Sequence, residues 1–143
     1  MNVHDLLADP AREFVHLPGP SPQDRLESLR SRAPITLPDL YLRLLAVSNG
    51  PEGELGVEPG WFQLWRAEDV LKLNADYEVA EYHPGFFGIG SSGGGIMFAL
   101  AESDSGDSPV FGLPFDSIDP ADVRIISPDF ESFFLSLGRV FAR

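Results

Sequence analysis

The stretch that decides the fold is FFGIGSSGGGIMFALA, residues 86–101, in which two apolar runs flank a segment of serine and glycine. Its glycines match two enzyme motifs at once. Gly88, Gly90 and Gly93 have the G-x-G-x-x-G spacing of a dinucleotide-binding turn, and the overlapping G-x-S-x-G would make Ser92 a hydrolase nucleophile. The third interpretation is a simple turn between two adjacent strands.

The surrounding chain argues against both enzyme motifs. A dinucleotide site needs a helix of about three turns after the glycines, but the segment IMFALAESDSGDSP has room for about two before Gly106 and Pro109 interrupt it. In the hydrolase fold the histidine follows the serine. All three histidines precede Ser92, at His4, His16 and His83, which leaves only a convergent arrangement using His83. We therefore predict a turn at SSGGG, where glycine supplies positive φ or lets a partner approach.

On either side of this turn, the sequence predicts mainly helices before it and short strands after it. The runs VFGLPF and VRIIS predict two more strands, and WFQLW at residues 61–65 predicts another. Helices are predicted over residues 22–32, from Pro38 to a left-handed Gly50, over residues 66–82, and after an N-cap at Ser127 with Pro128 and Asp129 in the first turn. We predict one α+β domain over residues 1–143, with an N-terminal arm at 1–22 and a core at about 37–137.

The amino-acid composition excludes several kinds of site. The chain has 143 residues, no cysteine and a formal net charge of −12, which excludes disulfides, thiolate catalysis and cysteine-ligated zinc. The histidine spacing predicts no metal site, and we expect no cofactor. The apolar runs are too short to span a bilayer, and the opening residues do not resemble a secretory signal, so a cytoplasmic protein without membrane contact is expected.

Acidic residues concentrate in the second part of the chain. Residues 1–50 hold six acids and five bases, whereas residues 51–143 hold sixteen acids and five bases. Such a field repels nucleic-acid phosphates and attracts basic protein surfaces, although excess acid also serves solubility alone. The loop acids that we select as candidate partner-binding residues are Glu52, Glu54, Glu58, Asp104 and Asp107. The aromatic residues Trp61, Phe62 and Trp65 are either core residues, which is the commoner case, or anchors for a partner.

Four segments together resemble the SUKH superfamily, the SMI1/KNR4-like proteins. They are LPDLYLRLLAVSNGPEG, LWRAEDVLKLN, FFGIGSSGGG and DFESFFLSL, and they extend over residues 37–137. The resemblance implies an α+β fold with a mixed sheet packed by N-terminal and C-terminal helices, and no catalytic activity. Many relatives have an acid directly after the glycine turn, where this chain has Ile96.

The resemblance also implies a function. It predicts a non-enzymatic immunity protein of a polymorphic toxin system, which binds and neutralises a cognate protein toxin, often a nuclease, through the toxin's basic surface. The alternative is a cytoplasmic regulatory or scaffold module that binds a host protein or a small ligand, and an enzyme is the third class. The sequence leaves the oligomeric state open.

Overall fold

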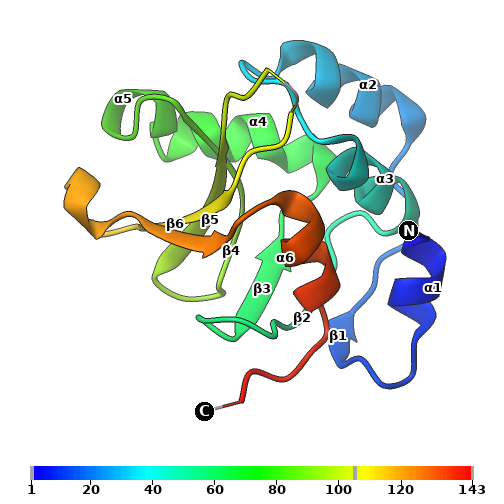
Figure 1. Ribbon diagram of the computed structural model, residues 1–143. Coiled ribbons are helices and arrows are strands. Elements are labelled where there is room, and N and C mark those ends of the chain that lie inside the picture. The colour runs from blue at the N-terminus through cyan, green and yellow to red at the C-terminus, as the bar shows by residue number, and fades with distance from the viewer. Residues whose placement is uncertain (1, 105, 143) are drawn as a thin grey trace.

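A single seven-stranded sheet organises the molecule (Figure 1). The structure is a computed structural model and describes residues 2–104 and 106–142. Its strands follow each other in chain order across the sheet. They are β1 (Phe14–His16), β2 (Glu52–Glu54), β3 (Trp61–Leu64), β4 (Phe86–Ser91), β5 (Ile96–Ala101), β6 (Val110–Pro114) and β7 (Arg124–Ser127).

The α+β fold class is confirmed, but the expectation of a mixed sheet is wrong. Every strand pairing within the described residues is antiparallel. The physical reason is the connectivity, because each strand returns beside its predecessor, whereas a parallel pair needs a crossover to the opposite end of the sheet. The predicted turn between FFGIG and IMFALA is confirmed as the β4–β5 hairpin.

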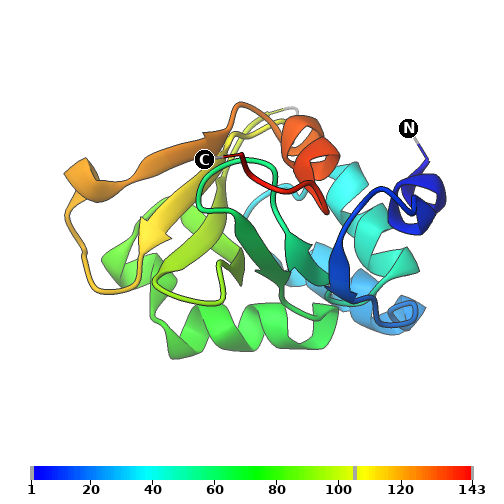
Figure 2. The same ribbon diagram turned by 90° about the horizontal axis from the view of Figure 1, so that it is seen from below.

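Helices pack on both sides of the sheet (Figure 2). Most of them meet the inner face, where the main core contains Phe62, Phe87, Ile89, Phe98 and Leu100 from the strands. The helical elements are α1 (Val3–Ala8), α2 (Gln23–Arg32), α3 (Asp39–Val47), α4 (Ala67–Asp76), α5 (Val79–Tyr82), the 3₁₀ turn η1 (Pro120–Asp122) and α6 (Phe130–Ser136). Within the described residues, no helix combines the length and apolar character that crossing a bilayer requires.

Alternation along the strands creates a second, smaller core on the opposite side, which we call the outer face. Its buried centre consists of Val79 from α5 with Met97, Ala99 and Leu113 from the sheet. Partly buried side chains pack around this centre, namely Trp65, Phe86, Phe111 and Val123.

Three local predictions need correction. The N-cap of α6 is Asp129, whose side chain accepts the Ser132 N–H, because Ser127 is already committed to β7. The helix predicted over residues 66–82 is broken at Glu78, which adopts left-handed φ and ψ of 53° and 45°. Gly50 has a φ of +100° as predicted, but it lies two residues beyond the C-cap of α3.

The N-terminal segment contributes to both the core and the sheet. Val3, Leu6 and Leu7 of α1 belong to the main core, and β1 pairs with β2 at one sheet edge. Arg12 then joins this segment to the C-terminal helix, because its Nη1 donates to the carbonyl oxygens of Leu135 and Leu137 at 2.8 and 2.7 Å. The segment between α1 and β1 is therefore held against the end of α6 by the Arg12 side chain, and the Glu13 N–H adds a hydrogen bond to the Gly138 carbonyl oxygen at 2.7 Å.

Candidate functional site

The glycine turn has no features of a catalytic loop. It connects a strand to a strand, so there is no helix N-terminus to receive a pyrophosphate. The Ser92 hydroxyl oxygen accepts the N–H groups of Gly94 and Ile96, each at 3.3 Å, which ties the side chain into the turn. Ile96 itself packs against the main core.

The two glycines before the turn are required by packing. A Cβ at Gly90 would come within 2.6 Å of the Gln63 carbonyl oxygen, and one at Gly88 within 2.7 Å of the Met97 sulfur. The side chain of Asn74 also donates to the Gly88 carbonyl oxygen at 2.8 Å and accepts the Gly88 N–H at 2.7 Å. The enzyme-like spacing thus reflects the close approach of β3 to Gly90, and of the Met97 and Trp65 side chains to Gly88.

The SNG and W-x-x-E segments meet in one hydrogen-bond network. Asn49 is buried, and its Oδ1 accepts the N–H of Ala67 at the start of α4 at 2.8 Å. Its Nδ2 donates to the Glu68 carboxylate at 2.9 Å, and Arg25 of α2 pairs with the same carboxylate at 3.1 Å. Partial burial acts to raise the pKa of Glu68, but the Asn49 hydrogen bond and the nearby arginines lower it overall. This network positions α2, α3 and α4 relative to each other.

The structure separates the five predicted partner-binding acids into two groups. Glu54 pairs with Trp61, and Trp61 contacts Gly93, so the Glu52–Glu58 segment lies at the same end of the sheet as the glycine turn. Asp104 and Asp107 occupy the loop after β5, at the opposite end, where Glu102 accepts the Thr36 N–H at 3.2 Å. In Figure 1 the loop after β5 lies near α2 at the top of the view, whereas β2 lies at the bottom.

Within the first group, the three glutamates have different surroundings. Glu52 is half-buried and accepts a hydrogen bond from the indole Nε1 of Trp61 at 3.0 Å. Glu54 is half-buried in β2, whereas Glu58 is exposed and lines a small hollow with Arg124. Glu52 is therefore held in a defined position by Trp61.

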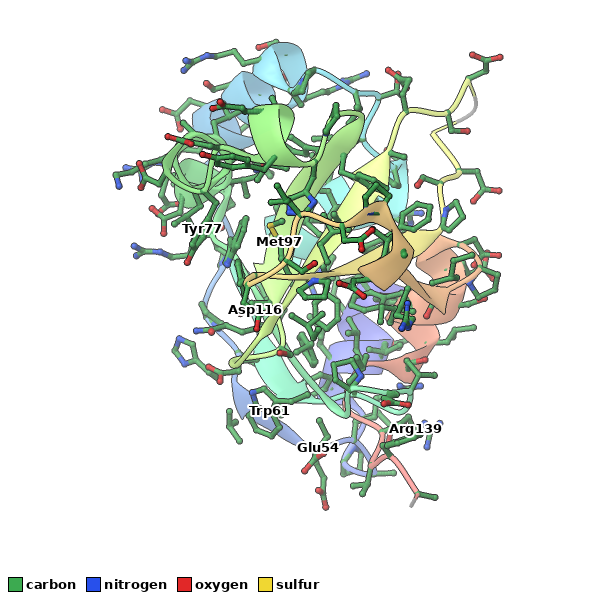
Figure 3. All side chains as sticks on the ribbon, turned by 90° about the vertical axis from the view of Figure 1, so that its left-hand side faces the viewer. Glu54, Trp61, Tyr77, Met97, Asp116 and Arg139 are labelled. Atoms are coloured by element: carbon green, nitrogen blue, oxygen red, sulfur yellow. The ribbon has the colours of Figure 1, made fainter. Side chains whose placement is uncertain are left out.

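A groove of about 500 Å³ extends from Glu52 toward the end of α4. Its lining includes Gln63, Trp65, Asp69 and Tyr77. The aromatic rings continue beyond the groove, because Trp65 stacks on Tyr77 with ring centroids 6.0 Å apart and Tyr77 contacts Phe115 at 4.9 Å. Figure 3 shows Tyr77, Asp116, Trp61 and Glu54 along this side of the molecule. We call Trp65, Tyr77 and Phe115 the aromatic row.

Of the aromatic residues singled out in the sequence, Phe62 is fully buried, while Trp61 and Trp65 are half-buried. Tyr77 and Phe115 were not singled out, because they belong to separate elements that only the fold brings together. The composition of the segment that contains both residues does carry a signal, because residues 73–123 contain nine acids and no lysine or arginine. Among the described residues, no three histidine, aspartate or glutamate side chains are grouped so as to hold a metal.

Comparison with known families identifies one match. The model of the SMI1 / KNR4 family (SUKH-1) matches residues 20–136, which include the Asn49 network, the glycine turn and most of α6. Among curated proteins, none matches the chain significantly.

Proposed function

The chain belongs to the SMI1/KNR4 (SUKH-1) family, and from this membership we propose that it is a non-enzymatic immunity protein that neutralises a cognate toxin by stoichiometric binding in the cytoplasm. The observation that carries the proposal is the family match over most of the chain. Immunity proteins of toxin systems are common in this family, and its members are generally not enzymes.

The local geometry supports a binding role. Residues of the sequence motifs have structural tasks, because Ser92 stabilises its turn and Asn49 accepts the first N–H of α4. The surface beside them combines aromatic rings with acids, in the groove from Glu52 to Tyr77. Aromatic side chains and a polar surround are typical of protein interfaces.

Charge supports a basic partner. The formal net charge of −12 would steer a positively charged toxin surface toward the chain. We therefore propose Glu52, Glu54 and Glu58 at one end of the sheet, and Asp104 and Asp107 at the other, as acids that accelerate this association. Their separation implies long-range attraction rather than one compact acidic site.

The function is tested by locating a toxin-like domain encoded in a neighbouring gene and co-expressing it with the chain. We expect growth to be restored and an equimolar complex to be recovered by size-exclusion chromatography. Unrestored growth with folded protein would overturn the proposal. Recovery of a metabolic or cell-wall enzyme in place of a toxin would favour the regulatory alternative.

The role of the five acids is tested by converting the glutamates to Gln and the aspartates to Asn. Charge complementarity acts mainly on encounter, so we expect the association rate to fall by about tenfold at low salt, with little change in dissociation. The wild-type rate should fall steeply as salt rises, because the Debye length is about 8 Å at physiological ionic strength. Equal association rates for variant and wild type at low salt would refute the steering role.

A further inference from the structure

Exposure increases across the outer face from β4 to β7. One row of paired positions crosses these strands through Gly88, Ala99, Phe111 and Ile125. Gly88 and Ala99 are buried near α4 and α5, Phe111 is half-buried, and Ile125 is 65% exposed. The apolar outer face therefore continues past its helical cover and reaches the solvent at β7.

Further large apolar and aromatic side chains are exposed around the same side. Ile118, in the loop between β6 and η1, is also 65% exposed. Among the described residues, nine large apolar or aromatic side chains are exposed. Five of them lie in or next to α5, in β7 or in the loop after β6, the elements that border this face: Tyr77, Tyr82, Phe115, Ile118 and Ile125. Scattered apolar side chains are ordinary on a surface, but a contiguous set indicates an interface.

Acids border these side chains, and we call Glu78, Glu81, Asp116, Asp119 and Asp122 the acidic rim. Within the part of the chain that the structure describes, none of the five forms an ion pair with a lysine, arginine or histidine. The elements that carry them, α5 and the loop around η1, lie on the same side of the molecule, at the left of Figure 1. The Glu78 carboxylate, hydrogen-bonded to Tyr82, raises the pKa of that hydroxyl.

We propose that the outer face and its acidic rim form the docking surface for a cationic protein surface that also presents apolar side chains. A second copy of the chain fits poorly, because two such faces would place like charges opposite each other. Nucleic acid is repelled by the same field. The inference rests on the proposed function in taking the partner to be a toxin, and it names the surface that the toxin contacts.

Three synthetic peptides of equal length test the surface chemistry: alternating Arg and Leu, alternating Arg and Ser, and alternating Glu and Leu. Titration into isotopically labelled protein, followed by NMR, locates the contact. We expect the Arg–Leu peptide to bind most tightly and to shift the amide resonances of Ile118, Ile125 and residues 78–82. Shifts centred on Glu52 and Glu54 or on residues 102–107 would overturn the proposal, whereas Glu58 lines a hollow with Ile125 and does not discriminate.

Variants separate the apolar and charged contributions. We expect Ile118→Ser with Ile125→Ser to weaken the Arg–Leu peptide by about tenfold or more, as loss of interface anchors does, while the Arg–Ser peptide is hardly affected. Asp116→Asn with Asp119→Asn should weaken both cationic peptides, and Asn retains the cap that Asp119 provides to η1. The control, Leu135→Ser with Val140→Ser, removes exposed apolar side chains elsewhere and should leave binding unchanged.

The outcomes for the two proposals are distinguishable. If the wild type neutralises the toxin and the Ile118→Ser, Ile125→Ser variant does so equally well, the docking surface is wrong and the immunity function stands. If the wild type fails to neutralise while the peptide results hold, the immunity function is wrong. Sedimentation that shows a dimer lost in the same variant would replace the toxin with a second copy.

Discussion

At the scale of single residues, side chains from the segments that resemble the family stabilise the fold. Asn49 satisfies a backbone donor and a carboxylate at once, Asn74 bonds both backbone groups of Gly88, and Tyr41 is fully buried. Burial raises the pKa of Tyr41, which keeps its hydroxyl protonated. Motif spacing in this chain is therefore explained by packing before any chemistry is invoked.

Asn49→Ala should destabilise the protein by about 1–3 kcal/mol, because it leaves the Ala67 N–H without its acceptor and removes one of the two side-chain donors to the Glu68 carboxylate, with Arg25 remaining. Asn49→Asp keeps an acceptor for Ala67 but places a second carboxylate beside Glu68, so it should also destabilise. Urea unfolding followed by circular dichroism measures both. An unchanged midpoint for Asn49→Ala would contradict the assigned role.

Gly90→Ala should destabilise by about 1–3 kcal/mol, as overpacking does, because the added Cβ meets a backbone oxygen at 2.6 Å and the Leu64 Cα at 3.0 Å. Gly95→Ala is the matched control, since a Cβ there has open space within 4 Å. Thermal unfolding of the two variants compares them directly. Equal losses would mean that the turn requires glycine for another reason than close packing.

At the scale of elements, the sequence predicted strands and helices best where an apolar pattern extends over several residues. The four apolar runs around the glycine turn became β4, β5, β6 and β7, because alternation and breakers are local signals. β1 and β2 went unpredicted, since FVH and EGE are three residues long and are strands only through pairing with each other and with β3. The end of α4 also escaped prediction, because Glu78 turns left-handed within a helical pattern.

The N-cap of α6 predicts a pH dependence. The backbone N–H of Ser132 lowers the pKa of Asp129, so the folded-state value lies below the unfolded one. This carboxylate therefore stabilises the protein above the unfolded pKa of about 3.9, and the stabilisation disappears as pH falls through the folded value. Asp129→Asn should preserve the cap and flatten the stability profile below about pH 4.

The measurement for Asp129 is the urea midpoint at a series of acidic pH values. Asp129→Ala is the comparison, because it loses the acceptor and should be about 1 kcal/mol less stable at neutral pH. If Asp129→Asn has the same acid profile as the wild type, the carboxylate does not contribute through its titration. Such a result would leave the geometric cap intact.

At the scale of the whole molecule, the candidate site shows what sequence alone could not supply. The charge imbalance and the acids from Glu52 to Glu58 were visible in composition. The aromatic row was not, because Trp65 and Tyr77 lie in the connection between β3 and β4 whereas Phe115 follows β6, and the three rings meet only after the sheet forms. The sequence also did not show that Glu52–Glu58 and the Asp104–Asp107 loop lie at opposite ends of the sheet, because strand direction decides the end of the sheet at which each loop lies.

The N-terminal segment gives the last prediction. The family match begins at residue 20, yet Val3, Leu6 and Leu7 are buried in the main core. Burial of each such side chain contributes roughly 1.5–3 kcal/mol, and a domain has only about 5–15 kcal/mol in total. Deleting residues 2–17 should therefore leave a loosely packed or unfolded chain by near-ultraviolet circular dichroism and calorimetry. Val15→Ser, at a 65% exposed position of β1, should change stability by less than about 0.5 kcal/mol. A truncated chain with the wild-type melting temperature would show that the matched region folds without these residues.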